Sequence, residues 1–157
     1  MTINLTLNGQ HRDLEILPSD TLLDVLRRNS FIMQKKGCGR GSCGSCTVLL
    51  NDKPVASCKI PAFLAKNKEI VTLDYFKKYS EYNDIMKGFK KAGIELCGYC
   101  NAGKIFMTYQ IMKMHKIPTR QEIANLMKNL APCCTDLETL VTGVQYAMSV
   151  KKSRPKS

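Results

Sequence analysis

The sequence predicts an α+β protein, with β-strands in the first half of its 157 residues and helices in the second half. The first seven residues alternate polar and apolar side chains, which is typical of a strand with one buried face. After residue 73 apolar residues recur at helical spacing instead. We therefore expect a strand-rich domain over residues 1–74, a linker over 75–80 and a helical domain over 81–157.

Short turns separate the expected strands of the first domain. Asn8–Gly9 between two alternating segments predicts a tight hairpin, and Asn51–Asp52 predicts a second turn. Pro18, Ser19 and Asp20 open a helix whose apolar residues extend to Leu26. The expected strands cover residues 3–7, a return strand through Leu14 and Ile16, and residues 47–50, 55–58 and 69–73.

Four helices are expected in the second domain, which suggests a small four-helix bundle. The first ends near Gly93, and Pro118 ends the second. Thr119 and Glu122 match a capping box at the start of the third, and Asp136 can cap the fourth. Their apolar stripes are Tyr82, Ile85, Met86 and Phe89; Ile105, Phe106, Tyr109 and Met112; Ile123, Leu126, Met127 and Leu130; and Leu137, Leu140, Val141, Val144 and Met148.

The chain is strongly basic, with 24 lysines and arginines against 13 acidic residues. Such a balance raises the question of nucleic-acid binding. However, the lysines are scattered, tryptophan is absent, and no aromatic pair stands in an RNA-binding pattern. We interpret the charge as a lysine-rich solvated surface; the alternative is a basic face that docks on acidic partner subunits.

The sequence also predicts where the protein resides. No run of 18 apolar residues occurs, so we expect no membrane span. The N-terminus lacks a basic segment followed by an apolar core, so we expect no secretory signal and a cytoplasmic protein. Eight cysteines in a reducing compartment indicate metal binding or catalysis more often than disulfides. His11 and His115 stand in polar surroundings, and we interpret both as surface residues.

Three closely spaced cysteines and a distant fourth form the first candidate metal site. Their spacing, C-x4-C-x2-C with a remote partner, is that of plant-type [2Fe–2S] proteins and predicts a ferredoxin-like (β-grasp) first domain. Glycines allow the loop to wrap closely and to direct amide N–H groups at the cluster sulfides. The alternatives are a zinc site or two disulfides, although zinc sites usually pair C-x2-C knuckles. The predicted ligands are Cys38, Cys43, Cys46 and Cys58, and the loop glycines are Gly37, Gly39, Gly41 and Gly44.

The remaining four cysteines form the second candidate site. Cys97 and Cys100 make a C-x2-C pair, and Cys133 and Cys134 follow after a predicted helix–turn–helix. A lone C-x2-C pair is a weak signal that also suits a redox or zinc motif. The number of cysteines supports a second cluster, because four cysteines remain and a [2Fe–2S] cluster needs four ligands.

These two sets in this order resemble the small iron–sulfur subunit of the molybdenum hydroxylases, the family of xanthine dehydrogenase and aldehyde oxidoreductase. The resemblance covers nearly the whole chain. Residues 37–48, GCGRGSCGSCTV, are similar to the family's G-C-G-E-G-x-C-G-x-C-T-V. Residues 97–100, CGYC, resemble its C-G-F-C, and the P-T-x-x-E-I pattern recurs at 118–123. Cys134–Thr135 resembles its closing C-T.

The departures from the family pattern lie mostly around the second site. Leu96 and Asn101 replace the Gln and Thr that flank the family's C-G-F-C, and leucine cannot make the hydrogen bond by which that Gln touches the pterin. Cys133 and Cys134 are adjacent, whereas the family has one residue between its last two ligands. Both can bind iron only if the loop kinks. In the first loop, Arg40 replaces the family's Glu and should raise the cluster's reduction potential.

The resemblance implies an electron-transfer subunit with two [2Fe–2S] clusters and no catalytic residue of its own. Molybdenum–pterin and FAD are then expected on a large molybdenum-binding subunit and an FAD-binding subunit, and neither nucleic acid nor a membrane is an expected partner. The second cysteine set and Leu96 would face the molybdenum subunit, and the first set, with Gly39, Gly41 and Gly44, would face the flavin.

Two other functions compete with this reading. One is a stand-alone two-cluster ferredoxin that carries electrons by diffusion. The other is a zinc-stabilised module that binds nucleic acid, which predicts a colourless protein and salt-sensitive binding.

Overall fold

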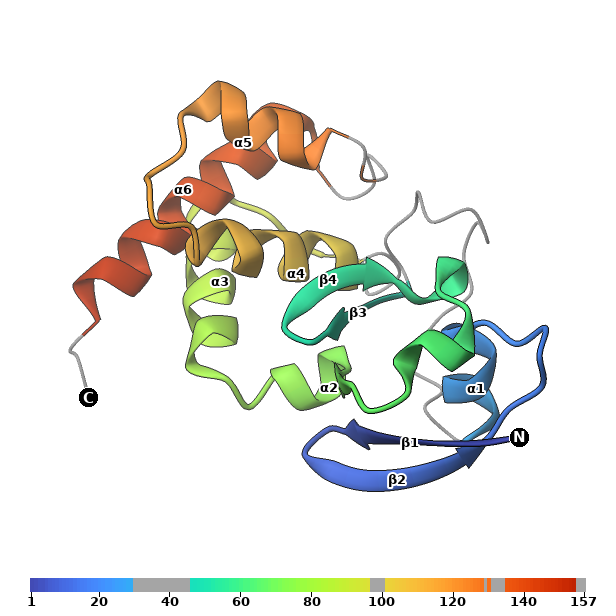
Figure 1. The fold of residues 1–157 in the computed structure, drawn as a ribbon. Helices are drawn as coiled ribbons and strands as arrows, with labels where there is room; N and C mark the ends of the chain where they lie inside the picture. The colour runs from blue at the N-terminus through green and yellow to red at the C-terminus, as the bar shows by residue number, and fades with distance from the viewer. Residues whose placement is uncertain (30–45, 97–100, 129, 131–134, 155–157) are drawn as a thin grey trace.

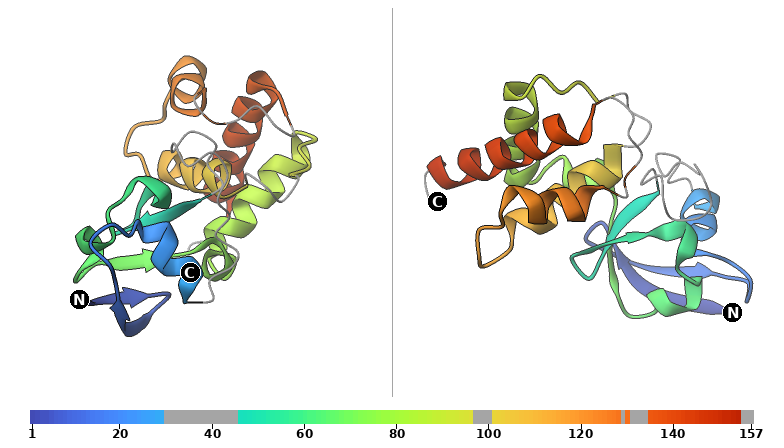
Figure 2. Two further views of the ribbon diagram at one scale, coloured as in Figure 1. Left: turned by 90° about the vertical axis from the view of Figure 1, so that its right-hand side faces the viewer. Right: turned by 90° about the horizontal axis from the view of Figure 1, so that it is seen from above.

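The computed structural model describes residues 1–29, 46–96, 101–128, 130 and 135–154. Within these ranges the chain forms five strands and six α-helices, in agreement with the predicted α+β class. Figure 1 shows the sheet and the first helix on one side of the molecule and the later helices on the other. The first strand and the end of the last helix lie at opposite ends of the molecule (Figure 2).

A five-stranded mixed sheet forms the first half. Its strands are β1 (Thr2–Leu7), β2 (Gln10–Glu15), β3 (Thr47–Leu50), β4 (Lys53–Ala56) and β5 (Glu69–Val71). Their order is β2-β1-β5-β3-β4, with β1 and β5 parallel and the other pairs antiparallel. The alternation seen in the sequence places Ile3, Leu5 and Leu7 in the core.

Both predicted hairpin turns are confirmed. Asn8 and Gly9 have φ values of 51° and 80°, and Asn51 and Asp52 have φ values of 49° and 68°. Positive φ at both central residues is the mark of the type I′ turn, whose twist matches that of the flanking strands.

Helix α1 (Leu22–Arg28) packs its apolar residues into a core shared with the sheet. Its N-cap is Thr21, slightly later than the 18–20 start expected from the sequence. The Thr21 hydroxyl accepts from the Asp24 N–H, and the Asp24 carboxylate accepts from the Thr21 N–H, which completes a capping box.

The expected strand 55–58 ends earlier than predicted. β4 stops at Ala56, and residues 57–59 form a 3₁₀ turn, η1 (Ser57–Lys59), which packs on α1. A second 3₁₀ turn, η2 (Ala62–Ala65), also contacts α1. Cys58 therefore sits in a turn and not in a strand.

Helices make up the second half. They are α2 (Leu73–Phe76), α3 (Ser80–Lys91), α4 (Asn101–Met112), α5 (Arg120–Met127) and α6 (Leu137–Ser153). α3 packs extensively along α6, and α4 contacts α3, α5 and α6 as well as β3 and β4. Thr119 and Asp136 cap α5 and α6 as predicted. Two residues of the predicted stripes, Leu126 and Leu137, are instead 40% and 38% exposed, because each lies near the end of its helix.

The segment expected as a linker contains most of a short helix. Strand β5 ends at Val71 and α2 begins at Leu73, so the expected strand 69–73 was too long. Phe76 is fully buried, with its ring centroid 5.1 Å from that of Phe106 and 4.9 Å from that of Tyr109 on α4. A four-residue helix is too short to show helical periodicity, which explains why the sequence pattern missed it.

Across the described part of the chain, none of the helices is both long and apolar enough to cross a bilayer.

Candidate functional site

Two of the eight cysteines lie in the described part of the chain, Cys46 and Cys58. The other predicted ligands lie outside the described residues, as do the loop glycines; they are Cys38, Cys43, Cys97, Cys100, Cys133, Cys134, Gly39, Gly41 and Gly44. Leu96, the predicted cofactor contact, is half-buried and packs against the helical core.

The hairpin of β3 and β4 brings Cys46 and Cys58 to the same end of the sheet. Thr47 at the start of β3 pairs with Ala56 at the end of β4, so the residues just beyond them also face each other. Ser57 confirms this contact, because its Oγ donates a hydrogen bond of 2.7 Å to the Cys46 carbonyl oxygen. The Ser57 N–H donates to the same oxygen at 3.3 Å.

Both thiols are at least partly shielded from solvent. Cys46 is 2% exposed and Cys58 is half-buried, and the two are not joined in a disulfide. Thiolate sulfur is the ligand that iron–sulfur clusters require. Within the described ranges, no group of three or more His, Cys, Asp or Glu side chains gathers to hold a metal ion. Cys46 and Cys58 are the two predicted ligands that lie in the described part of the chain, and iron binding by them stays a prediction.

Helix α1, which precedes the predicted ligands Cys38 and Cys43 in the sequence, is anchored as well. Its Arg28 guanidinium donates two hydrogen bonds of 2.9 Å to the buried Asp20 carboxylate. These bonds, and one from the Leu17 N–H, lower the pKa of Asp20. The Leu22 N–H donates to the Ile60 carbonyl, just after η1, at 2.7 Å. Helix α1 and the turn that carries Cys58 therefore belong to one packed unit.

The second set of cysteines is flanked by the N-termini of two helices. α4 begins at Asn101, directly after Cys100, and α6 has its N-cap at Asp136, two residues after Cys134. The Asp136 carboxylate accepts a 2.7 Å hydrogen bond from the Thr139 N–H, which lowers the pKa of Asp136. The helix starts thus fix where the chain leaves each half of this set.

A small cavity shows that these two helix starts lie together. It has a volume of about 50 Å³ and is lined by residues of α4, α5, α6 and the segment before α6, among them Lys104, Leu130 and Thr135. Thr135 directly follows Cys134, and Lys104 lies about one helical turn after Cys100. The structure thus brings the flanks of the two halves together, as a shared metal site requires.

Polar contacts tie the helical half to the turn of the β3–β4 hairpin. The buried Tyr109 hydroxyl on α4 donates a 2.9 Å hydrogen bond to the Asp52 carboxylate in the β3–β4 turn, and Lys113 forms an ion pair with the same carboxylate. Burial, and next the bond to Asp52, raise the pKa of Tyr109. The hairpin that holds Cys46 and Cys58 is therefore fastened to the helix that follows Cys100.

Sequence reasoning missed Ser57 and Lys104. Ser57 belongs to no recognised sequence motif. Its position next to the predicted ligand Cys58 was the available signal that its side chain could hold the backbone there. Lys104 is 1% exposed, whereas a lysine on a helix is normally solvated. Its spacing of four residues from Cys100 was the available signal. The two histidines, His11 and His115, are exposed as predicted.

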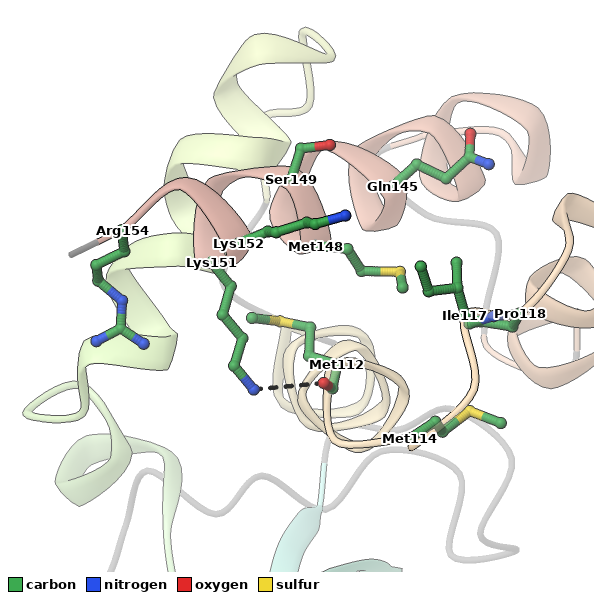
Figure 3. Close-up of a pocket in the computed structure, with 10 residues that line it drawn as sticks. All are labelled: Met112, Met114, Ile117, Pro118, Gln145, Met148, Ser149, Lys151, Lys152 and Arg154. Atoms are coloured by element: carbon green, nitrogen blue, oxygen red, sulfur yellow. Dashed lines mark hydrogen bonds between the residues drawn. The ribbon is translucent and has the colours of Figure 1, made fainter. Parts of the chain in front are cut away.

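A larger groove lies away from the cysteines (Figure 3). It has a volume of about 560 Å³ and lies between the end of α4, the segment after it and the last turns of α6. Met112, Met114 and Met148 line it, and the Lys151 ammonium donates to the Met112 carbonyl oxygen at 3.3 Å. Since α4 rises about 1.5 Å per residue, the groove is roughly 16 Å from the cysteine end of the helix. It is not part of either candidate metal site.

Comparison with known proteins matches both halves. Residues 5–71 match a 2Fe-2S iron-sulfur cluster binding domain, and residues 72–145 match a second family described as a [2Fe-2S] binding domain. The nicotinate dehydrogenase small FeS subunit of Eubacterium barkeri is 34% identical over 149 residues, which cover 94% of this chain and 95% of the relative. The xanthine dehydrogenase iron-sulfur-binding subunit of Escherichia coli O157:H7 is 32% identical over 146 residues, which cover 92% of each chain.

A solved structure has the same fold over its whole length. A chain of quinoline 2-oxidoreductase from Pseudomonas putida 86 superposes with a TM-score of 0.82 at 28% identity. The match covers 99% of this chain and 98% of that one.

Proposed function

Since the chain belongs to the small [2Fe–2S] subunits of the molybdenum hydroxylase family, we propose that it carries electrons from a molybdenum–pterin centre to a flavin or another acceptor. The observation that carries this proposal is the order of the two [2Fe–2S] domain matches along one chain. Relatives described as iron–sulfur subunits of dehydrogenases match nearly its full length. Cys46 and Cys58, held at one end of a hairpin, supply thiols where the first domain needs them.

The proposed ligands divide between the two domains, whose boundaries we place at 1–74 and 81–157. The first cluster is bound by Cys38, Cys43, Cys46 and Cys58, with Gly39, Gly41 and Gly44 shaping the loop. The second is bound by Cys97, Cys100, Cys133 and Cys134, in a domain that we propose to be a four-helix bundle of α3 to α6. A bound [2Fe–2S] cluster supplies a one-electron acceptor and donor. The protein's part is to hold the thiolates, exclude solvent and fix the two sites relative to each other.

Partner subunits complete the proposed enzyme. Relatives that match nearly the whole chain are described as iron–sulfur subunits of dehydrogenases. In the proposed enzyme, substrate oxidation falls to a large molybdenum-binding subunit, and the electrons leave through an FAD-binding subunit, in the cytoplasm. Leu96 packs in the helical core and has no polar side-chain group, so we propose that backbone groups make any pterin contact there.

Metal analysis tests the proposal directly. Protein purified anaerobically should be brown and contain about four iron atoms and an equal amount of acid-labile sulfide per chain, because each [2Fe–2S] centre holds two of each. Cys58→Ser and Cys100→Ser should each remove about half of the iron and a different half of the EPR signal. Zinc in place of iron would overturn the proposal, and about two irons in the unaltered chain would exclude the second centre.

Co-purification separates a subunit from a diffusing carrier. A tagged chain expressed in its native host should bring down a larger subunit that contains molybdenum. If it elutes instead as a brown monomer that exchanges electrons without that subunit, the stand-alone ferredoxin is correct.

A further inference from the structure

The groove between the end of α4 and the last turns of α6 leaves large apolar side chains exposed. Ile117 is 72% exposed and Met114 is 44% exposed, and Met112 and Met148 line the groove with them. In Figure 3 the side chains of Met148 and Ile117 extend toward the groove from its two sides. Exposed apolar side chains that gather in one place mark surfaces that bind a partner. Methionines suit such a surface, because their flexible side chains adapt to the shape of the partner.

Both chain segments that form the groove are basic. Neither residues 112–118 nor residues 145–154 include an aspartate or a glutamate. The lysines and arginines of the two segments are Lys113, Lys116, Lys151, Lys152 and Arg154. An apolar groove with this border favours a partner that is itself acidic.

Two of these cations already have a carboxylate partner within the chain. Lys113 forms an ion pair with the Asp52 carboxylate. The Arg154 guanidinium lies 3.2 Å from the Asp84 carboxylate. The other three lysines form no ion pair with the residues that the structure describes. The groove therefore keeps an excess of positive charge that a binding partner can neutralise.

We propose that this groove binds an acidic segment of a partner subunit, which inserts an apolar side chain between the methionines and places its carboxylates beside the lysines. The inference rests on the proposed function, which supplies the partner subunit. In such an interface the buried apolar contact contributes most of the affinity, whereas complementary charge selects the partner and speeds association. Because the groove is not part of either candidate metal site, changes to it should leave the iron content unaltered.

A carbodiimide crosslink tests the proposed contact in the assembled enzyme. The reagent joins a lysine amine directly to a carboxylate and adds no spacer, so it reports groups that are in contact. The complex that co-purifies with the tagged chain is treated, digested and analysed by mass spectrometry. We expect Lys116 or Lys152 to be joined to an aspartate or glutamate of another subunit. Crosslinks from these lysines only to a second copy of this chain, or none while other lysines of the chain react with a partner subunit, would overturn the proposal.

Matched variants measure what the groove contributes to assembly. Ile117→Ser changes its apolar part and Lys152→Glu its charge, and both side chains are exposed in the single chain, so folding should be preserved. Leu17→Ser and Lys66→Glu are the controls, because these exposed side chains belong to the half that contains the sheet. If the reversed charge destabilises the end of α6, Lys116→Glu replaces Lys152→Glu, because Lys116 lies outside the helices.

The readout is the Kd of each holoprotein variant for the partner subunits, at about 0.1 M and about 1 M salt, where the screening length is roughly 10 Å and 3 Å. At the lower concentration we expect each groove variant to bind about tenfold more weakly, as the loss of a central contact commonly causes. High salt should remove most of the effect of Lys152→Glu but keep that of Ile117→Ser. The controls should change the Kd less than about twofold, and every variant should keep its iron.

Groove variants that bind as tightly as the unaltered chain, or controls that weaken binding equally, would also exclude the proposed contact. So would binding of the isolated chain to phosphatidylglycerol vesicles that Ile117→Ser abolishes, because this face would then serve a membrane. If the unaltered chain assembles with no other subunit, the proposed function fails and this inference fails with it. If the unaltered chain assembles and the groove variants assemble equally well, only this inference fails.

Discussion

The hydrogen bond from Ser57 to the backbone of Cys46 gives a direct test of how the first site is held. Ser57 is fully buried, and its Oγ lies 2.7 Å from the Cys46 carbonyl oxygen. Ser57→Ala removes this donor while leaving the shape of the turn almost unchanged. The weaker 3.3 Å bond from the Ser57 N–H remains, so the carbonyl keeps one partner.

The expected cost follows from the loss of one buried, neutral hydrogen bond. Such a bond contributes about 1 kcal/mol net, and the remaining N–H bond prevents the larger penalty of an unsatisfied carbonyl. Since 1.4 kcal/mol corresponds to a factor of ten, the end of the hairpin should open about fivefold more often. If opening limits the loss of iron, iron should leave the first centre about fivefold faster.

Iron release to an excess of chelator, followed anaerobically by absorbance, measures this rate. Two phases are expected, one for each centre, and Ser57→Ala should accelerate only the phase that Cys58→Ser abolishes. Ser80→Ala is the control, because the Ser80 side chain is exposed at the start of α3. Equal acceleration of both phases, or no change in either, would refute the reasoning that this bond locally holds the site.

Two further predictions concern the frame around the sites. Gly88→Ala would place a Cβ 2.3 Å from the backbone nitrogen of Ala147, so α3 and α6 must separate. We expect this overpacking to lower the free energy of unfolding by about 1–3 kcal/mol and to lower the thermal midpoint. Gly143→Ala should have a smaller effect, because the added Cβ meets only side chains that can move. Equal midpoints for the two variants would contradict this. Because Tyr109 has a folded-state pKa above its ordinary 10.0, the unfolded chain loses that proton first, and stability should fall as the pH rises above 10.0. Tyr109→Phe also removes the hydrogen bond to Asp52, but the thermal midpoint of this variant should fall less steeply as the pH rises above 10.0. The same dependence of the midpoint on pH in both proteins would show that Tyr109 contributes nothing to the fall.

Local chemistry made much of the fold predictable. The turns at Asn8–Gly9 and Asn51–Asp52 were readable because so few residues tolerate positive φ. The N-caps at Thr119 and Asp136 were readable because their side chains bond within their own helix. What the sequence did not reveal depends on distant partners. Phe76 becomes a core residue only when α4 lies against it, which no local pattern encodes.

In the candidate site, too, local sequence patterns were predictive, and features that depend on tertiary packing were not. The cysteine spacing predicted both [2Fe–2S] domains, and the family resemblance is confirmed by the full-length relatives. The ligand assignments stay predictions, with Cys46 and Cys58 brought to one hairpin end. The burial of Ser57 and Lys104 was missed, because serine and lysine are common surface residues and their burial depends on the tertiary structure.

The packing between the two halves bears on the proposed transfer of electrons through the molecule. Leu49 of β3 and Val71 of β5 belong to the same core as the apolar residues of α3 to α6. Tyr109 adds a polar tie from α4 to the turn at Asp52. The halves therefore share a core where the sequence suggested a linker, and the spacing between the hairpin site and the start of α4 is set by packed side chains. For the proposed two-centre electron carrier, a spacing fixed in this way keeps the electron-transfer distance constant, which a flexible connection between two separate domains would not do.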